Sequence, residues 1–397
     1  MTYQALQPSD KLLLGPGPAS VEPAILRAAS LNVLGYLDPE FVTIMDETME
    51  LLRAVFRTSN ELTLVVPGTG MAGMEAAVYN TVEPGDKVVV AVNGFFGERI
   101  ATIAERAGGE VTVVRYPWGQ AVDPSDLVKV VREVRPAILA CVHAETSTGV
   151  LQPMAEITRM AREYDCLLLV DAVTSLGGCP LEIDKWGIDA CYSGSQKCVG
   201  ALPGLAPLTL GPRARAKLAA RRTPVASWYL DLTLIEKYWT GNPRAYHHTA
   251  PVNLIYPIRE ALRMALDEGL ENRWARHLLN ARALRAGLRG LGLGLYSEDD
   301  VMLPPLTPVL IPDGVEDAKV RTAMLNEFGI EIGGGLGDAK GKIWRIGLMG
   351  YGSQRRHVLL VLTALEQLLL RFGHRAEAGA GVAAAGAMYD AAAKAGS

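Results

Sequence analysis

Short apolar runs alternate with helical repeats of apolar and polar residues along the first half of the chain. The runs are apolar at consecutive positions, so each strand would be buried on both faces. Helical patterns open at Met71 and after Pro153, among other places. This alternation predicts a mainly parallel sheet covered by helices, with functional loops at the carboxyl ends of its strands. The predicted strands are 62–66, 87–92, 111–114, 137–142 and 167–171.

The pattern changes twice further along the chain. It becomes mainly helical near Asn253, and after Leu291 short strands are mixed with two amphipathic helices that end near Phe372. The last residues are mostly Ala and Gly, and we expect them to form a partly ordered helix. We therefore predict an α/β fold with a large domain and a smaller α/β C-terminal domain. The expected divisions are an N-terminal arm (1–20), the large domain (21–268), the small domain (269–375) and a tail (376–397).

Composition narrows the class of protein. A chain of 397 residues, 49% of them apolar, can bury one large core and a smaller one. The net charge of −4 and the interleaved charges argue against nucleic acid or a membrane as the main partner. We expect a cytoplasmic protein, because no signal peptide or spanning segment is evident and the cysteines lack metal or redox spacing. The cysteines are Cys141, Cys166, Cys179, Cys191 and Cys198.

The stretch V-V-P-G-T-G-M-A-G-M-E-A-A (65–77) matches the dinucleotide pattern G-x-G-x-x-G. It follows a strand and opens a helix, so its amides and the helix dipole form an anion site. A dinucleotide site also needs an acid after the next strand, but that strand ends in N-G-F-F. A nicotinamide dehydrogenase is therefore a poor interpretation. A single phosphate ester with a flat ring stacked on Phe96 fits better, and a turn needed only for packing remains an alternative.

Two charged residues lie in segments that would bury them. Lys197, in S-G-S-Q-K-C, follows an apolar run and is surrounded by small residues, which would desolvate its amine and lower its pKa. Asp171 ends a buried strand, where a carboxylate is costly without a partner. It is either a helix cap or part of a structural ion pair, or it is the partner of a heterocyclic nitrogen. An anion loop, an aromatic ring, a buried acid and a desolvated lysine together predict a pyridoxal phosphate site.

These residues belong to motifs that resemble the alanine–glyoxylate and serine–pyruvate aminotransferase family, within the class V, fold-type I pyridoxal phosphate enzymes. The resemblance runs from about Leu12 to Phe372. It implies ping-pong transfer of an amino group from alanine or serine to glyoxylate or pyruvate. The motifs are L-L-G-P-G-P, E-L-T-L-V-V-P-G-T-G-M-A-G-M-E-A-A, V-E-P-G-D-K-V-V-V-A-V-N-G-F-F-G-E-R, H-A-E-T-S-T-G-V-L-Q-P, D-A-V-T-S-L-G-G, W-G-I-D-A-C-Y-S-G-S-Q-K-C, Y-H-H-T and R-I-G-L-M-G.

The resemblance implies a role for each matched residue. Lys197 would form the Schiff base with pyridoxal 5′-phosphate, and Asp171 would pair with the ring nitrogen. Val173 would cover one ring face, although a plain core valine is nearly as good an interpretation. The other cofactor contacts would be Thr69, Gly70, Met71 and Gln196 at the phosphate, Thr146 at the cofactor hydroxyl or phosphate region, and Phe96 stacked on the ring.

The resemblance also implies a substrate site and a homodimer. Arg345, in an apolar strand-like segment, is by pattern either a buried ion pair or a carboxylate fork, and the family has its carboxylate-binding arginine there. We expect Gly35 and Tyr36 to shape the same pocket. Tyr246 and Thr249 would reach the phosphate in the neighbouring subunit. The adjacent pair His247–His248 lacks a third ligand, so we predict no metal site.

Several other functions fit less well. A cysteine desulfurase needs a reactive cysteine in the C-terminal domain, and all the cysteines precede it. A non-catalytic cofactor-binding module is disfavoured by the complete catalytic set. The closest alternative is a pyridoxamine–pyruvate aminotransferase, which the K-C-V-G-A-L-P-G-L segment and the Ala/Gly-rich tail resemble. That enzyme gives up the phosphate loop, whereas this chain keeps G-T-G-M.

Overall fold

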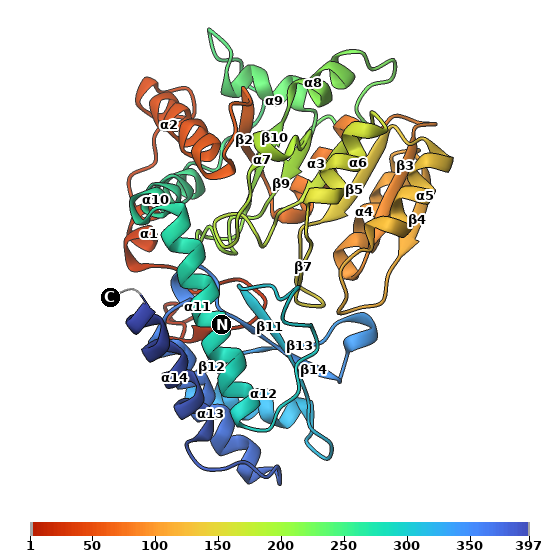
Figure 1. The fold of residues 1–397 in the computed structure, drawn as a ribbon. Helices are drawn as coiled ribbons and strands as arrows, with labels where there is room; N and C mark the ends of the chain where they lie inside the picture. Colours follow the sequence, from red (N-terminus) through yellow and green to blue (C-terminus); the bar gives the residue numbers. More distant parts are fainter. Residues whose placement is uncertain (1–2, 396–397) are drawn as a thin grey trace.

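A seven-stranded sheet forms the centre of the larger part of the molecule in the computed structural model, which describes residues 3–395 (Figure 1). The strands pair in the order β2-β10-β9-β8-β5-β3-β4, and only β10 runs antiparallel to its neighbours. This sheet confirms the predicted fold class. Its strands are β2 (Leu62–Pro67), β3 (Lys87–Val92), β4 (Glu110–Arg115), β5 (Ile138–Val142), β8 (Leu167–Asp171), β9 (Ala190–Tyr192) and β10 (Leu205–Leu210).

Helices connect and cover these strands. α3 packs on α4 and α5 packs on α6, and both pairs contact the sheet. Local sequence sets where they begin: α5 starts at Pro124, and the Asp123 side chain caps it by accepting from the Ser125 amide at 2.8 Å. The helices of this part are α1 (Pro23–Ala28), α2 (Pro39–Phe56), α3 (Gly70–Thr81), α4 (Phe95–Arg106), α5 (Pro124–Val134), α6 (Ala155–Glu163), α7 (Ile183–Trp186), α8 (Pro212–Ala219), α9 (Leu232–Trp239) and α10 (Val252–Glu268).

A smaller antiparallel sheet forms the second part of the molecule, with the strand order β11-β14-β13. Helix α11 runs from the larger part into this one, where α13 and α14 pack against it and α12 packs against α13 (Figure 1). The Ala/Gly-rich segment forms α14, which buries Ala385 and Tyr389. The elements are β11 (Leu306–Leu310), β13 (Gly333–Gly334), β14 (Ile343–Gly347), α11 (Leu270–Gly290), α12 (Asp317–Phe328), α13 (Arg355–Arg371) and α14 (Ala380–Ala395), with the 3₁₀ turns η1 (Gly337–Ala339) and η2 (Gly350–Gly352).

Each part has its own apolar core. One cluster of buried residues extends from Ile25 to Leu270 in the sequence, and the second consists of Leu14 and residues 283–389. The change from one core to the other falls at the start of α11. Among residues 3–395, no helix combines the length and the apolar character that crossing a membrane requires.

The N-terminal segment joins the two parts. Strand β1 (Leu12–Leu13) pairs in parallel with β12 (Ile330–Glu331), and the Gly347 amide donates to the carbonyl of Leu14 at 2.7 Å. A few residues later, the amide of Ala19 donates to the carbonyl of Gln196 at 2.9 Å. The segment between these contacts therefore passes directly beside Lys197. The remaining strands are the short hairpin β6 (Ala144–Glu145) and β7 (Val150–Leu151).

Candidate active site

A cavity of about 120 Å³ lies at the carboxyl ends of β5 and β8. In a mainly parallel sheet this edge is where ligands bind, because the loops that leave the strands converge there. Most residues that the sequence predicted to contact the cofactor line this one cavity. They are Thr69, Gly70, Met71, Phe96, Thr146, Asp171, Val173, Gln196 and Lys197.

One wall of the cavity is the beginning of α3. Thr69 is its N-cap residue and makes no side-chain capping bond. None of the described residues accepts a hydrogen bond from the amides of Gly70 or Met71. Gln196 adds a side-chain amide whose oxygen is buried without a partner among residues 3–395. Free amides at the positive end of a helix dipole bind a phosphate group.

Phe96 lies in the first turn of α4, and a buried carboxylate fixes this turn. One oxygen of Glu145 accepts from the amides of Phe96 and Gly97 at 3.0 and 3.4 Å. Its other oxygen accepts from the amide and hydroxyl of Ser147 at 3.0 and 2.6 Å. Burial raises the pKa of Glu145, and these donors oppose the rise. Glu145 lies in the motif H-A-E-T-S-T-G, but its sequence context alone predicted no role for it.

Asp171 is buried at the end of β8, opposite Tyr192 of β9. The Tyr192 hydroxyl donates to one carboxylate oxygen at 2.8 Å, and the Val173 amide donates to the other at 2.8 Å. Desolvation raises the pKa of Asp171 to about 7. A cationic group in the cavity would reverse that effect and be stabilised in turn. The contact of Tyr192 with Asp171 was not predicted, because only the register between β8 and β9 brings the two residues together.

Lys197 is largely desolvated, and the N-terminal segment covers its amine. Nζ donates to the carbonyl of Pro16, and Gly17 follows with φ of +114°. A β-carbon at Gly17 would collide with Nζ, so the close approach requires glycine. Burial, together with the positive charge of Arg345, lowers the pKa of Lys197 to about 8. The motif L-L-G-P-G-P, for which the sequence suggested no role, therefore positions the amine.

Arg345 reaches this region from β14 of the smaller part. Its Nε donates to the carbonyl of Gly334 at 2.7 Å, and Nη1 donates to the carbonyl of Thr146 at 3.3 Å. No described residue accepts from Nη2, so one arm of the guanidinium is open to a ligand. Burial lowers the pKa of Arg345 to about 10, and the negative charge of Glu145 acts in the opposite direction. The group remains a cation at neutral pH and suits a carboxylate.

Five predicted site residues do not line the Lys197 cavity within one chain: Arg345, described above, and four residues that lie elsewhere. Gly35, Tyr36 and Thr249 border a separate surface hollow of about 460 Å³. Tyr246 packs its ring on Tyr36 with centroids 5.3 Å apart, and its hydroxyl is 3.4 Å from that of Thr249. Their assigned roles therefore stay predictions, and any contact with a cofactor would have to involve a second chain.

The cavity residues fit a phosphate ester joined to a flat ring that carries a protonated nitrogen. Free amides lie at the start of α3, an aromatic ring and the Val173 side chain lie along the cavity, and a buried carboxyl group can pair with the nitrogen. An amine with a lowered pKa is a nucleophile for an aldehyde. Among residues 3–395 we find no group of three or more metal-ligating side chains, and the His247 and His248 rings contact each other through Nδ1 atoms 2.8 Å apart.

Comparison with known proteins gives a consistent result. The family model described as aminotransferase class-V matches residues 27–351. The (S)-ureidoglycine–glyoxylate transaminase of Bacillus subtilis is 40% identical over 398 residues, which covers 96% of this chain and 95% of the relative. A crystal structure of ureidoglycine–glyoxylate aminotransferase from Bacillus subtilis has a TM-score of 0.95 and 41% identity, and covers 98% of this chain and 100% of that chain.

Two further solved structures are also similar. Alanine–glyoxylate aminotransferase from Nostoc has a TM-score of 0.91 at 49% identity, covering 93% of this chain and 98% of that chain. Pyridoxamine–pyruvate aminotransferase from Mesorhizobium loti has a TM-score of 0.92 at 30% identity, covering 96% of this chain and 98% of that chain.

Proposed function

Because the chain belongs to the class-V aminotransferase family and is a transaminase, we propose that it moves an amino group from a small L-amino acid, alanine or serine, to glyoxylate or pyruvate, with pyridoxal 5′-phosphate held in the Lys197 cavity. The observation that carries this proposal is the placement of Lys197, Asp171 and the free amides of α3 around one cavity. When bound, the cofactor supplies an aldehyde that takes up the amino group and a ring that delocalises charge from the α-carbon.

Each cavity residue has a defined task in this proposal. The amides of Gly70 and Met71 bind the phosphate together with Thr69 and Gln196. Phe96 and Val173 hold the two ring faces, and Thr146 lies beside the ring substituents. Asp171 keeps the ring nitrogen protonated, which is favourable because the cation removes the cost of a buried, unpaired carboxylate.

Lys197 is proposed as the base and acid of the reaction. Its pKa of about 8 leaves a useful fraction of neutral amine near neutral pH. Once its hydrogen bond to the carbonyl of Pro16 is broken, the amine would remove the α-proton of the amino acid. It would return this proton to the carbon that the cofactor supplies as its aldehyde. The open arm of Arg345 binds the carboxylate of donor and acceptor in turn, which produces ping-pong kinetics.

The proposed assembly is a homodimer with shared sites. Tyr36 and Tyr246 are 37% and 57% exposed, and both belong to a surface with other exposed aromatic rings, such as Trp228. A second copy would cover this surface and bring Tyr246 and Thr249 to the partner's phosphate, with Gly35 and Tyr36 beside its substrate. We place the protein in the cytoplasm, a reducing compartment, because all of its cysteines are free and buried.

We also propose the following division of the chain into domains. The two separate cores support a border near Glu268, between α10 and α11. The large domain would be 21–268 and the small domain 269–375. The arm 1–20 would connect the two, and the tail 376–397 would extend the small domain.

Two relatives suggest other amino donors. The match to the Bacillus subtilis relative covers 96% of this chain, and the name of that relative makes ureidoglycine a second candidate donor. Pyridoxamine with pyruvate is the remaining alternative. The free amides of Gly70 and Met71 favour a bound phosphate ester over a free pyridoxamine substrate.

A panel of half-reactions tests the proposal. The cofactor-loaded protein is mixed separately with alanine, serine, ureidoglycine and pyridoxamine, while its visible absorbance is followed and the oxo-acid product is identified. We expect alanine or serine to bleach the cofactor band and glyoxylate to restore it. If only ureidoglycine bleaches the cofactor band, ureidoglycine is the donor in place of alanine or serine. If only pyridoxamine is converted, the result favours a pyridoxamine–pyruvate aminotransferase. No conversion by any donor would contradict the proposal.

A further inference from the structure

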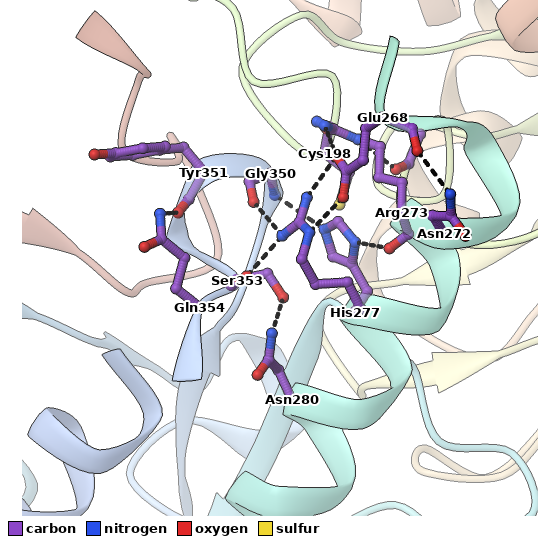
Figure 2. Close-up of polar contacts among 12 residues, drawn as sticks. Cys198, Glu268, Asn272, Arg273, His277, Asn280, Gly350, Tyr351, Ser353 and Gln354 are labelled. Carbon is purple, nitrogen blue, oxygen red and sulfur yellow. Dashed lines mark hydrogen bonds and ion pairs between the residues drawn. The ribbon is translucent and has the colours of Figure 1, made fainter. Parts of the chain in front are cut away.

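A second polar cluster lies where α10 ends and α11 begins, outside the Lys197 cavity (Figure 2). We call it the junction cluster: Glu268, Arg273, Arg276, His277 and Asn280. It borders a cavity of about 340 Å³. The proposed function assigns no role to any of its residues, although Arg273, His277 and Asn280 are buried polar side chains, which are costly unless their contacts compensate.

Arg273 holds the loop that carries Lys197. Its Nη2 donates to the carbonyl of Cys198 at 2.7 Å, and its Nε donates to the carbonyl of Gly177 at 3.0 Å (Figure 2). The third nitrogen, Nη1, donates to Glu268 at 2.8 Å. Cys198 directly follows Lys197, so this guanidinium ties the start of α11 to the backbone of the amine's own loop.

His277 holds a different segment, the turn η2 that follows the strand of Arg345. Its Nε2 accepts from the Gly350 amide at 3.0 Å, and its Nδ1 contacts the carbonyl of Arg273 at 2.7 Å. An amide can only donate and a carbonyl can only accept, so the ring is neutral with its proton on Nδ1. Burial, together with the nearby arginine charges, lowers the pKa of His277 to about 3.

Two further side chains of α11, those of Arg276 and Asn280, bind the same segment. Arg276 donates through Nη1 to the carbonyls of Gly350 and Ser353 at 3.1 and 2.6 Å. Asn280 donates to the Ser353 hydroxyl at 3.1 Å and accepts from the Tyr389 hydroxyl at 2.6 Å. Side chains of α11 therefore hold both η2 and the loop of Lys197.

The two held segments also contact each other. Gly350 has φ of +53°, and a β-carbon there would lie 3.4 Å from the Cys198 carbonyl oxygen and 3.6 Å from that of Lys197. These are ordinary contact distances, so η2 packs directly against the loop of Lys197. Each segment is nevertheless held by its own side chain of α11, Arg273 or His277.

The junction cluster is not suited to bind an anionic ligand itself. All three side-chain nitrogens of Arg273 already donate to Glu268 or to backbone carbonyls. The same is true of Arg276, whose Nε and Nη2 donate to Glu268 at 2.5 and 3.0 Å. Because every nitrogen of these guanidinium groups already donates to the protein, both arginines hold protein segments in place.

On the basis of the proposed function, we infer that Arg273 and His277 are positioning residues for transamination. Arg273 fixes the loop of Lys197 through the carbonyl of Cys198, and His277 fixes the turn after Arg345 through the amide of Gly350. Both bonds originate on the first two turns of α11. This helix thereby sets the spacing between the amine that moves the proton and the guanidinium that binds the carboxylate.

Kinetics of single variants separate the two arms of this inference. In Arg273→Met the loop of Lys197 is released, and we expect kcat to fall by roughly 10- to 100-fold with little change in KM, because reacting groups lose their alignment. In His277→Phe the turn after Arg345 is released, and we expect KM for both acids to rise about 5- to 10-fold with kcat nearly kept. Asn272→Ala, on the same turn of α11, should behave as the unmodified protein.

Conservative variants distinguish positioning from mere stability. A glutamine at 277 can accept from the Gly350 amide, whereas an asparagine is too short. We therefore expect His277→Gln to keep the KM of the unmodified protein and His277→Asn to resemble His277→Phe. Arg273→Lys should keep part of kcat, because a lysine can reach one of the two carbonyls. Rates are expressed per folded molecule. The inference is wrong if folded Arg273→Met and His277→Phe show unchanged kcat and KM. If those two variants do not fold, Arg273→Lys and His277→Asn are judged by the same criterion.

Hydrogen exchange supplies a readout that is independent of activity. On the unmodified protein and each variant, mass spectrometry follows the amides of residues 198–201 and 346–353. We expect faster exchange of the first segment in the Arg273 variants and of the second in His277→Phe and His277→Asn, but not in His277→Gln. Unchanged exchange in both segments would overturn the inference. If the unmodified protein does not transaminate, the proposed function fails, and the exchange result alone decides whether α11 holds these segments.

Discussion

The cavity around Lys197 and the surface around Tyr246 differ in how completely one chain builds them. In the cavity, Asp171 is buried and receives hydrogen bonds from Tyr192 and Val173. At the surface, Tyr246 is 57% exposed, and its hydroxyl is 3.4 Å from that of Thr249. The residues of the proposed proton chemistry are therefore fixed by their own chain, whereas the surface residues stay exposed, as the proposed homodimer requires.

The comparison suggests a division of labour. Groups that must be desolvated to shift their pKa are held by buried contacts within the chain, because a small displacement would expose them to water. Groups that only add affinity for the phosphate can come from a second copy. Changes inside the cavity should therefore have larger effects on turnover than changes at the surface.

The largest of these effects is expected from Asp171→Asn. Asparagine keeps the shape of the side chain but removes the charge that pairs with a ring nitrogen, and we expect kcat to fall by about 10²- to 10³-fold. Steady-state kinetics on the cofactor-loaded protein measure the loss. Asp165→Asn is a matched control, because Asp165 forms an exposed ion pair with Arg213. A kcat within threefold of the unmodified protein would separate Asp171 from the chemistry.

The pH dependence of cofactor capture probes the desolvation of Lys197. Only the neutral amine attacks an aldehyde, so a pKa of about 8 predicts a capture rate that rises about tenfold per pH unit up to pH 8 and then levels. Stopped-flow absorbance of the cofactor-free protein measures it. Because Asp171 titrates near pH 7, the profile is repeated in Asp171→Asn. A rate that still rises above pH 9 would mean that the amine is not desolvated.

Arg345→Met tests the wall of the site that comes from the smaller part of the molecule. A charge-assisted hydrogen bond contributes about 1.5–3 kcal/mol, so we expect KM for both acids to rise roughly 10- to 100-fold with a smaller change in kcat. Arg321→Met, which removes a partly exposed partner of Asp317, is the control. An unchanged KM would move the carboxylate site elsewhere.

The smallest effect is expected at the surface. In the proposed homodimer, Tyr246→Phe removes a hydroxyl that would reach the phosphate of the neighbouring subunit. We expect cofactor affinity to fall about 2- to 10-fold, since a hydrogen bond contributes about 1 kcal/mol. Equilibrium titration with cofactor measures it, and Tyr229→Phe on the same surface is the control. If the fold-loss of cofactor affinity in Tyr246→Phe exceeded the fold-loss of kcat in Asp171→Asn, the comparison drawn above would be reversed.

Much of the fold followed from the sequence, and one strand shows why the rest did not. Strands β2, β3, β4, β5 and β8 were predicted because their apolar runs are continuous. Strand β10 was not, since Pro207 interrupts its pattern and proline cannot donate within a sheet. Here its carbonyl accepts from Ser193 at 2.7 Å, so the antiparallel strand tolerates it.

The site was predicted to a similar extent. Motifs identify groups that act on a ligand, such as Lys197 and Asp171, but say little about residues that hold those groups. Glu145 and Tyr192 act through tertiary contacts, and the carbonyl of Pro16 reaches Lys197 from the N-terminal segment. Periodicity and spacing carry no signal for such long-range contacts.

Covalent trapping of the cofactor tests the central claim most directly. The protein is loaded with pyridoxal 5′-phosphate, reduced with borohydride, digested and mapped by mass spectrometry, with Lys197→Ala treated in parallel. The account predicts that the added mass appears on the peptide containing Lys197 and is missing from the same peptide of the variant. A label on another lysine, or none while the cofactor is bound, would contradict it.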